Sequence, residues 1–368
     1  MPKRRSAKKR SPAAAVLLAV LCLLLLAVSR YLDSRSEPAA SAPASAAAQT
    51  DAPKLEVHFL DVGQGDSALL FCGEETLLID GGKVKNNQKL IARLKELEVD
   101  HLDAVICSHP DEDHCGGLAA VLASTQTDAF YCSVDSWHTT AFSDVTKYVA
   151  EQGISVTVPQ AGDSFAFGEA SVEFLGPVED YGDDPNEGSL VARVRYGETS
   201  FLFTGDMGFE AEDDMLAAGV DVSATVLKVA HHGSAGSSST EFLQAVHPQY
   251  AVISVGADND YGHPTEAALN RLSACGIPVY RTDLLGEIIA VSDGSAVTIT
   301  TASNEAPSAS GAASQTADSY GYVGNSSSKV VHLASCGKLP GESNRVYFAS
   351  LEEALTAGYR RHASCLGN

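Results

Sequence analysis

The chain has 368 residues, of which 45% are hydrophobic and 20% charged, and its formal net charge is −22. This composition is sufficient for one large hydrophobic core, with residues left over for tails and a small module. Residues 1–36 hold eight basic side chains and one acidic one, which leaves −29 on the rest of the chain. So acidic a surface repels phosphate backbones, and the composition does not favour nucleic-acid binding by general electrostatic attraction.

The N-terminus has the pattern of an export signal. Six of the first ten residues are basic, and residues 13–28 form an uncharged apolar run of 16 residues. A buried core helix would carry polar side chains at helical spacing, and this run has none. This length is close to the roughly 17 residues of a spanning helix, so residues 1–35 are either a signal anchor or a cleaved signal peptide. The positive-inside rule favours the anchor. We predict a single-pass protein of the cell membrane with an extracellular C-terminal domain, or else a secreted protein.

The middle of the chain alternates between strand and helix patterns. Residues 36–53 are rich in Ala, Ser and Pro and predict a flexible linker. Beyond it, a layered α/β domain is predicted over 54–301, because short apolar runs alternate with amphipathic segments. The predicted strands are 55–60, 67–72, 76–79, 104–107 and 200–204, and the predicted helices are 88–98 and 264–275. A second linker, 302–319, precedes a C-terminal module over 320–368.

The cysteines of this domain do not form a regular framework. An odd number of cysteines without regular spacing indicates small buried side chains more than disulfides. One disulfide among them is the alternative. They are Cys72, Cys107, Cys115, Cys132 and Cys275.

Four metal-binding side chains follow the predicted strand 104–107 at once. They are His109, Asp111, Asp113 and His114. Loops at strand ends commonly carry ligands, and imidazole with carboxylate suits zinc, manganese or iron(II). A solvated acidic loop that happens to contain two histidines is the alternative, but four such groups within six residues favour a divalent metal.

Similar groups recur after other strand-like segments. Asp206 follows 200–204, the pair His231 and His232 follows an apolar run at 226–230, and His263 lies in Tyr-Gly-His-Pro. A single loop histidine is more often a surface residue than a ligand, whereas repeated placement at strand ends favours one shared site. Lys228 could stabilise developing negative charge there, but a lysine at a strand end is more often solvated.

The order His-x-Asp-x-Asp-His, Thr-Gly-Asp, His-His-Gly resembles the metallo-β-lactamase superfamily. Within it, the motifs at 59–67, 78–82, 108–114, 227–234 and 261–264 resemble the hydrolase domain of ComEC-type DNA-uptake proteins. The resemblance implies an αββα sandwich. It also implies two divalent ions. Manganese competes with zinc for this site, because Asp111 and Asn186 stand where the superfamily usually has histidine and make the ligand set richer in oxygen.

The resemblance also assigns roles to these residues. Asp206 would bridge the two ions, His109 and Asp111 would hold one ion, and Asp113 and His114 would face the other. His231, His232 and His263 compete for the remaining positions. Asp111 and Asp113 are the predicted catalytic residues, while Gly63, Gly65 and Asp66 are predicted to form a supporting tight turn.

The C-terminal module has its own set of candidate ligands. His332, Cys336, His362 and Cys365 suit a closed tetrahedral zinc site. The intervening pattern predicts a strand and then a helix capped by Ser350 and ended by Gly358. The module resembles the small metal-binding module of Ada-type DNA repair proteins, with His362 where Cys is usual. A disulfide between Cys336 and Cys365 is the alternative to zinc.

Three functions remain open from the sequence. The first is a metal-dependent nuclease or phosphodiesterase acting on DNA, supported by the ComEC resemblance, with a separate competence permease as a partner. The second is a hydrolase of a small ester, lactone or phosphate, and the third is a nucleic-acid-binding module without activity. The sequence makes no prediction of oligomeric state.

Overall fold

The computed structural model describes residues 54–257, 259–301, 322–333, 336, 338–340, 345–348 and 351–366. The predicted export segment over 1–35 and the two predicted linkers, 36–53 and 302–319, lie outside these residues. Among the described residues, no helix combines the length and the apolar character needed to cross a membrane.

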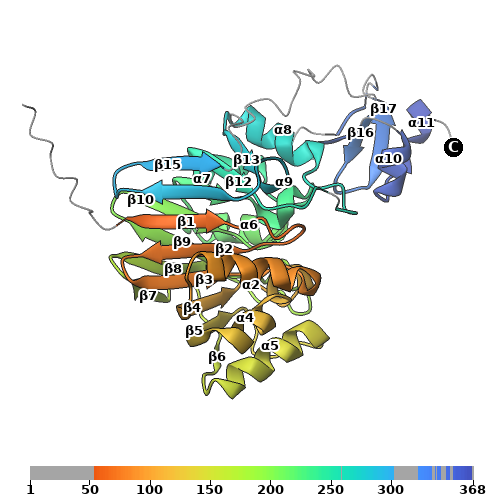
Figure 1. Ribbon diagram of the computed structural model, residues 1–368. Coiled ribbons are helices and arrows are strands. Elements are labelled where there is room, and N and C mark those ends of the chain that lie inside the picture. Colours follow the sequence, from red (N-terminus) through yellow and green to blue (C-terminus); the bar gives the residue numbers. More distant parts are fainter. Residues whose placement is uncertain are drawn as a thin grey trace, which may run out of the picture. The chain divides into compact units, whose positions relative to one another are not determined.

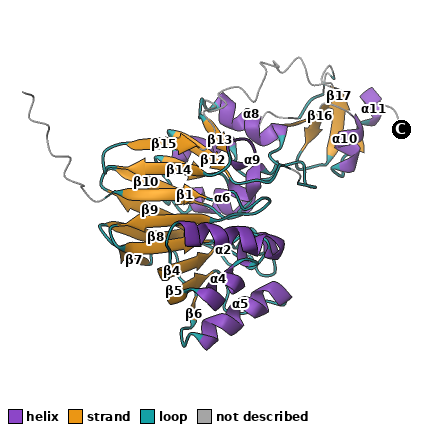
Figure 2. Cartoon of the chain, viewed as in Figure 1, coloured by secondary structure: helices purple, strands orange, loops and turns teal. Residues whose placement is uncertain are grey.

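Two mixed sheets form the domain (Figures 1 and 2). In the first, eight strands lie in the order β15, β14, β1, β2, β3, β4, β5 and β6. Strands β3 to β6 are parallel, whereas β1 is antiparallel to both β2 and β14. The bounds in this order are Val297–Thr301, Ile288–Ser292, Leu55–Phe59, Ala68–Cys72, Glu75–Ile79, His101–Cys107, Gln126–Cys132 and Val156–Thr157.

The second sheet has seven strands in the order β13, β12, β11, β10, β9, β8 and β7. Strands β10 to β13 are parallel and β7 to β10 antiparallel. In the same order the bounds are Val279–Arg281, Tyr250–Ile253, Val226–Lys228, Thr199–Phe203, Val191–Tyr196, Ala170–Gly176 and Ser164–Phe167. Each sheet thus contributes a set of parallel strands whose C-terminal ends carry loops.

The main core lies between the sheets, since alternate side chains of both face inward. Phe59 of β1 stacks on Phe203 of β10 with ring centroids 5.9 Å apart, and Tyr131 of β5 stacks on Phe165 of β7 at 5.0 Å. Burial of such aromatic and branched side chains contributes roughly 1.5–3 kcal/mol each.

Helices cover the outer faces of both sheets (Figure 1). The outer face of the first sheet packs against α2 (Asn87–Glu96), α4 (Leu118–Ser124) and α5 (Thr140–Glu151). The second packs against α6 (Phe209–Ala217), α7 (Thr240–Val246) and α8 (Glu266–Ala274). The predicted four-layer α/β sandwich is therefore confirmed.

Helix α5 illustrates how the sequence specifies these elements. The Thr139 hydroxyl accepts a hydrogen bond from the Phe142 N–H at 3.4 Å, which caps the helix. Phe142, Val145 and Val149 are spaced to share one helix face, and all three are buried against the sheet. Ser239 and Thr265 cap α7 and α8 in the same way.

Short helices complete the loops of this domain: η1 (Val84–Asn86), α3 (Glu112–Cys115), η2 (Ala230–Gly233) and α9 (Thr282–Leu285). Cys72, Cys107, Cys115 and Cys132 are buried free thiols and Cys275 is a half-buried one. This agrees with the expectation that they behave as small buried side chains.

The C-terminal module forms a four-stranded sheet in the order β18, β16, β17 and β19. These strands are Arg345–Phe348, Tyr322–Asn325, Val330–Leu333 and Arg360–Arg361, and the helices are α10 (Leu351–Thr356) and α11 (Ala363–Leu366). Val331, Phe348, Ala354 and Tyr359 form its small core. The predicted strand and helix are present, and Gly358 has the predicted left-handed φ of 79°, while Ser350 lies outside the described residues.

Candidate metal centre

Ligand-type side chains gather where parallel strands of both sheets end. Asp80 follows β3 and the segment 109–114 follows β4, both in the first sheet. Asp206 follows β10 and the pair His231 and His232 follows β11, both in the second sheet. The site is therefore assembled from both sheets.

Four buried side chains form its centre. One ligand atom from each of Asp66, His114, Asp206 and His232 lies within 4.8 Å of the other three. Nε2 of His114 is 3.1 Å from Oδ1 of Asp206, and Nε2 of His232 is 3.6 Å from Oδ2 of the same residue. Nδ1 of His232 is 3.1 Å from Oδ1 of Asp66. Such spacing suits several ligands around a common cation.

Several of these atoms are buried without a hydrogen-bond partner, namely Nε2 of His109, His114 and His232 and Oδ1 of Asp206. An unpaired buried polar atom costs about 1–3 kcal/mol, so a protein rarely retains several in one place without a ligand. A divalent cation would satisfy the acceptor atoms together. The residues present thus fit a metal ion.

Outer contacts orient two of the histidines. Nδ1 of His114 lies 2.9 Å from Oδ2 of Asp80, and Nδ1 of His232 lies 2.9 Å from the carbonyl oxygen of Ser254. Asp80 also accepts hydrogen bonds from the N–H and hydroxyl of Ser108 at 2.7 and 2.8 Å. Because an oxygen partner engages each Nδ1, each Nε2 is left to face the centre, as in metal-binding histidines.

Burial and charge set the protonation of the site. Burial lowers the pKa of His109 to about 3 and that of His263 to about 4, which keeps both rings neutral and able to act as ligands. Burial also disfavours the charged form of His232, but Asp206 and Asp66 outweigh it and raise its pKa to about 9. Burial likewise opposes ionisation of Asp206, yet the neighbouring His114 and His232 hold its pKa well below the usual range.

The backbone at η2 is unusual. His231 and His232 have φ values of 50° and 53°, a left-handed conformation that is uncommon for residues other than glycine. The His231 N–H donates to the Gly205 carbonyl at 3.1 Å, which ties this turn to the loop that carries Asp206. Such strain is typical of functional sites.

The remaining predicted ligands surround the four central side chains. The His109 ring lies 4.1 Å from that of His114, and Oδ2 of Asp113 lies 3.7 Å from Nε2 of His232. Oδ2 of Asp111 is 3.9 Å from Nε2 of His109, and its side chain is 38% exposed. His231 is 3.6 Å from Asp206, and the His263 ring is 5.5 Å from that of His231. All eight predicted metal residues therefore lie in one neighbourhood.

Three features differ from the sequence reading. Asp66, predicted to be part of a supporting turn, is buried among the central side chains. Lys228 is not solvated: its side chain is 4% exposed, with Nζ 2.5 Å from Oδ2 of Asp66. Asp80 belongs to the motif 78–82, but the sequence analysis gives it no role in the metal site. For Lys228 the sequence does contain a signal, because apolar residues flank it on both sides and a lysine in a buried strand needs a partner of opposite charge.

The position assigned to Asn186 has a different contact. Ser189, three residues later, lies with its Oγ 3.4 Å from Nδ1 of His109 and accepts a hydrogen bond from the Asp206 N–H at 3.1 Å. The carbonyl of Asn186 accepts from the Ser189 N–H at 3.1 Å. Asn186 thereby supports the residue that touches the site.

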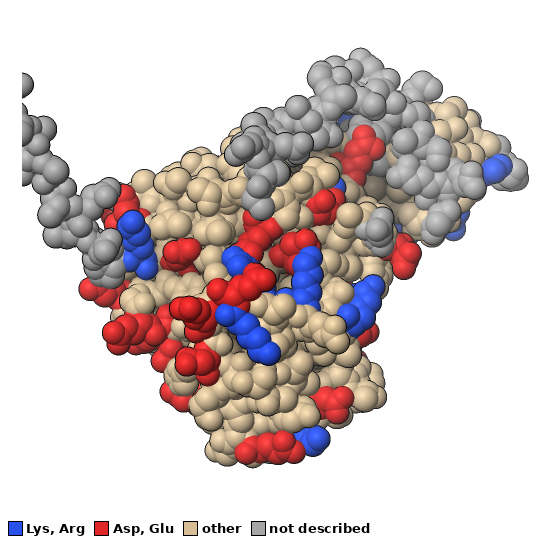
Figure 3. Space-filling view, viewed as in Figure 1, with Lys and Arg blue, Asp and Glu red and all other residues tan. Residues whose placement is uncertain are grey.

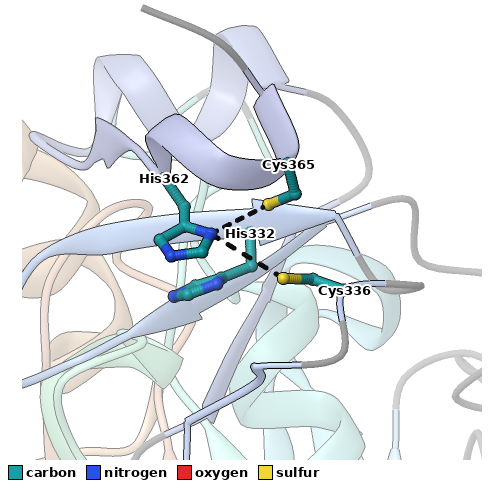
Figure 4. A group of neighbouring side chains, drawn as sticks. All are labelled: His332, Cys336, His362 and Cys365. Carbon is teal, nitrogen blue, oxygen red and sulfur yellow. Dashed lines mark hydrogen bonds between the residues drawn. The ribbon is translucent and has the colours of Figure 1, made fainter.

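A second cluster lies in the C-terminal module (Figure 4). The ligand atoms of His332, Cys336, His362 and Cys365 all lie within 4.8 Å of one another. Nδ1 of His362 is 3.2 Å from the Cys365 sulfur and 3.7 Å from the Cys336 sulfur, and both thiols are free. Nδ1 of His332 is buried without a hydrogen-bond partner. Two sulfur and two nitrogen atoms so arranged fit a tetrahedral metal site.

Comparison with known proteins relates the chain to competence proteins. It is 35% identical to Competence protein ComA of Neisseria gonorrhoeae over 283 residues, or 76% of this chain and 38% of that protein. It is 30% identical to ComE operon protein 3 of Bacillus subtilis over 251 residues, or 63% of this chain and 32% of that protein. The chain thus spans about a third of the length of these relatives, and the predicted resemblance to competence proteins is confirmed.

A structural neighbour and a family model were also found. A solved structure similar to this one is the metallo-beta-lactamase fold protein YhfI of Bacillus subtilis, with 15% identity and a TM-score of 0.47 over 65% of this chain and all of that one. Residues 60–257 match the model of the metallo-beta-lactamase superfamily. This match covers more than half of the chain, which therefore belongs to the metallo-beta-lactamase superfamily.

Proposed function

We propose that the chain is an extracytoplasmic metal-dependent hydrolase that cleaves phosphodiester bonds in DNA. The observation that carries the hydrolytic part is the set of buried, unpaired ligand atoms of His109, His114, His232 and Asp206 at the strand ends. The competence relatives support DNA as the substrate. The basic and apolar N-terminal pattern supports action outside the cytoplasm.

In this proposal the central side chains hold two divalent ions, zinc or manganese. Asp66, His109, His114, Asp206 and His232 form the buried part of the ligand set, while Asp111, Asp113, His231 and His263 complete it. Divalent ions in such a site polarise a phosphoryl oxygen and lower the pKa of water.

The protein's own groups supply the remaining chemistry. Asp111 is the more exposed of the two predicted catalytic carboxylates, at 38% against 18% for Asp113. It is therefore placed to accept a proton from the attacking water, whose oxygen forms the new bond to phosphorus, while the ester oxygen leaves and takes a proton from solvent to become an alcohol. Oδ2 of Asp113 lies 3.8 Å from Nζ of Lys83 and 3.7 Å from Nε2 of His232. The Asp113 carboxylate therefore orients the Lys83 ammonium group and the His232 ring.

Two further parts of the proposal concern the rest of the chain. A competence permease is proposed as a partner, because the relatives that the chain matches are competence proteins. We also propose that His332, Cys336, His362 and Cys365 bind a structural zinc, since a module of this size has too small a core to fold well alone.

The test uses the full chain, purified in mild detergent, stripped of metal and resupplied with Mn²⁺ or Zn²⁺. End-labelled single- and double-stranded DNA should be shortened only with metal, and not by the Asp111→Ala, Asp113→Ala variant. The matched control is Asp128→Ala, Asp135→Ala, which removes the same charge at two exposed positions that are not among the proposed ligands. Intact DNA in the presence of tightly bound metal would overturn the proposal.

That outcome would favour a second function. The chain beyond residue 36 carries −29, and Figure 3 shows Asp and Glu side chains spread over one face of the molecule. Such a surface disfavours long polyanions and favours a small ester, lactone or phosphate as the substrate of the same centre. Metal binding and DNA binding without any turnover would instead support a non-catalytic binding module.

A further inference from the structure

An exposed aromatic ring stands beside the metal centre. Tyr261 is 58% exposed, although it belongs to the loop that also carries His263. The two rings are stacked, with centroids 5.8 Å apart and planes inclined by 24°. An isolated exposed aromatic residue needs no special explanation. A binding role for Tyr261 therefore has to be argued from the hydrogen bonds that fix its loop and from the groups beside its ring.

The support is rigid. The Asn259 side chain donates to the carbonyls of Gly256 and His263 at 2.9 and 2.7 Å. Its Oδ1 accepts from the N–H groups of Tyr261 and His263 at 3.1 and 2.9 Å. One amide thereby makes four hydrogen bonds within one loop. The exposed ring is consequently held in place before any ligand arrives, which lowers the entropic cost of binding.

A cation lies over this ring, with Nζ of Lys83 5.0 Å from the ring centroid. Nζ of Lys83 is 3.2 Å from the Tyr261 hydroxyl and 3.8 Å from Oδ2 of Asp113. The Lys83 side chain is 15% exposed, so its ammonium group is only partly screened by water. A stacking surface and a fixed positive charge therefore stand together beside a predicted catalytic carboxylate, on a strongly acidic chain.

We propose that Tyr261 and Lys83 form a nucleotide subsite of the hydrolase. The exposed part of the Tyr261 ring stacks on the nucleobase next to the scissile bond, and Lys83 pairs with a phosphate of the same nucleotide. This inference rests on the proposed function and specifies how the substrate is held. Every nucleobase has a stacking face, so the subsite is tolerant of sequence. A neutral acyl substrate would make no use of the ammonium group.

A binding measurement tests the subsite without turnover. Thymidine 3′,5′-bisphosphate contains a base and two phosphates but no diester bond, and the sugar phosphate 2-deoxyribose 3,5-bisphosphate lacks only the base. Titration calorimetry on the full chain should show clear preference for the thymidine bisphosphate. Tyr261→Leu should raise its Kd roughly 5- to 100-fold, the effect of losing one stacked base. Tyr261→Phe should restore most of the affinity, and Leu284→Ala, which removes an exposed side chain outside the subsite, should leave Kd unchanged.

The charge is tested separately. Lys83→Gln should weaken binding of the bisphosphate and reduce the dependence of Kd on salt, because a phosphate contact is lost. An unchanged Kd in both Tyr261→Leu and Lys83→Gln would overturn the subsite. So would equal affinity of the natural chain for the bisphosphate and the sugar phosphate.

The failure of this inference is distinguishable from that of the proposed function. If thymidine 5′-(p-nitrophenyl) phosphate and methyl p-nitrophenyl phosphate are hydrolysed with equal KM, the diesterase activity is supported and the nucleotide subsite is refuted. If binding of the bisphosphate depends on Tyr261 but neither diester is hydrolysed, the subsite is supported and the diesterase activity is refuted.

Discussion

Nζ of Lys228 lies 2.5 Å from Oδ2 of Asp66, and both side chains are almost fully buried. The lysine also donates to the carbonyl of Val229 at 2.8 Å. Burial opposes the ionised form of Asp66, but Lys228 and then His232 lower its pKa below the usual value. Asp66 is thereby kept as a carboxylate, the form in which it could hold a metal ion.

Removal of this lysine should destabilise the fold. Lys228→Met leaves Asp66 buried without its partner, a type of change that costs about 3–5 kcal/mol. Urea unfolding of the metal-free protein measures the loss. Arg195→Met is the matched control, because Arg195 is an exposed cation of the same sheet, and its cost should stay below about 1 kcal/mol. Equal costs for the two variants would contradict the role given to the pair.

Asp80 should control metal affinity without acting as a ligand. Asp80→Asn weakens the acceptor that orients His114, and changes of this kind reduce metal affinity about 10- to 100-fold. Asn tolerates the left-handed φ of 58° at this position, so the fold should persist. Titration with Zn²⁺ or Mn²⁺ measures the effect, with the 63% exposed Asp128, changed to Asn, as the control. An undiminished affinity would argue against the outer contact.

Gly65 should be irreplaceable for a steric reason. A Cβ at this position would collide with the backbone carbonyl of Asp113, to which the Asp66 N–H also donates at 3.0 Å. Gly153 has a positive φ as well, 76°, but open space around it. Gly153→Ala should therefore cost only about 1–2 kcal/mol of conformational strain. Gly65→Ala should cost roughly 1–3 kcal/mol more and lower metal affinity, which thermal unfolding and metal titration would reveal.

Glu212 should make stability depend on pH. Its carboxylate accepts from the N–H groups of Ser238 and Ser239, and Arg271 lies opposite, yet burial raises its pKa to about 7. Because the folded pKa exceeds the unfolded value of about 4.3, the folded state binds the extra proton between these values. Stability should then fall as pH rises from about 4.5 to 7, by up to about 3 kcal/mol, and level off above.

The measurement compares unfolding free energies between pH 5 and 8 for the natural chain and Glu212→Gln. The difference between them isolates this group from the metal ligands, which titrate in both. Glu241→Gln, at an exposed position of α7, should keep the slope of the natural chain. A slope that survives in Glu212→Gln would refute the assignment.

The C-terminal cluster should account for one zinc ion per chain. Cys336→Ser removes one of the four ligands and should lower the zinc content of the purified protein by about one equivalent. Cys275→Ser, outside both clusters, should leave the content unchanged. Elemental analysis measures zinc, and thiol titration without reductant tests the disulfide alternative. The disulfide would be favoured if Cys336→Ser leaves the zinc content unaltered and the natural chain shows two fewer free thiols than its eight cysteines.

The parts predictable from sequence are those whose signal is local. The segment 109–114 places four ligands directly after one buried strand, so six residues identify the loop without any knowledge of tertiary structure. The same holds for α8, which lies within the predicted helix 264–275, and for the C-terminal strand and helix, where periodicity and end signals agree.

The parts that escaped prediction depend on packing. Asp66 stands in a glycine-rich turn, and such turns usually owe their acidic residues to backbone geometry. Only the packing of the first sheet against the second brings it to Lys228 and His232. Likewise, Asp80 follows β3 within the motif 78–82, but the sequence alone does not show its contact with His114, which lies 34 residues away.

The topology also constrains the order in which the polypeptide can mature. Every ligand of the hydrolase centre has been synthesised by residue 263, but the outer edge of β1 finds its partner only when Ile288–Ser292 is available. A nascent chain that stops between these points would carry a complete ligand set and an unpaired strand edge, which is a template for aggregation. For a chain that emerges from a ribosome or a translocon N-terminus first, the last two strands of the domain therefore act as its closing step.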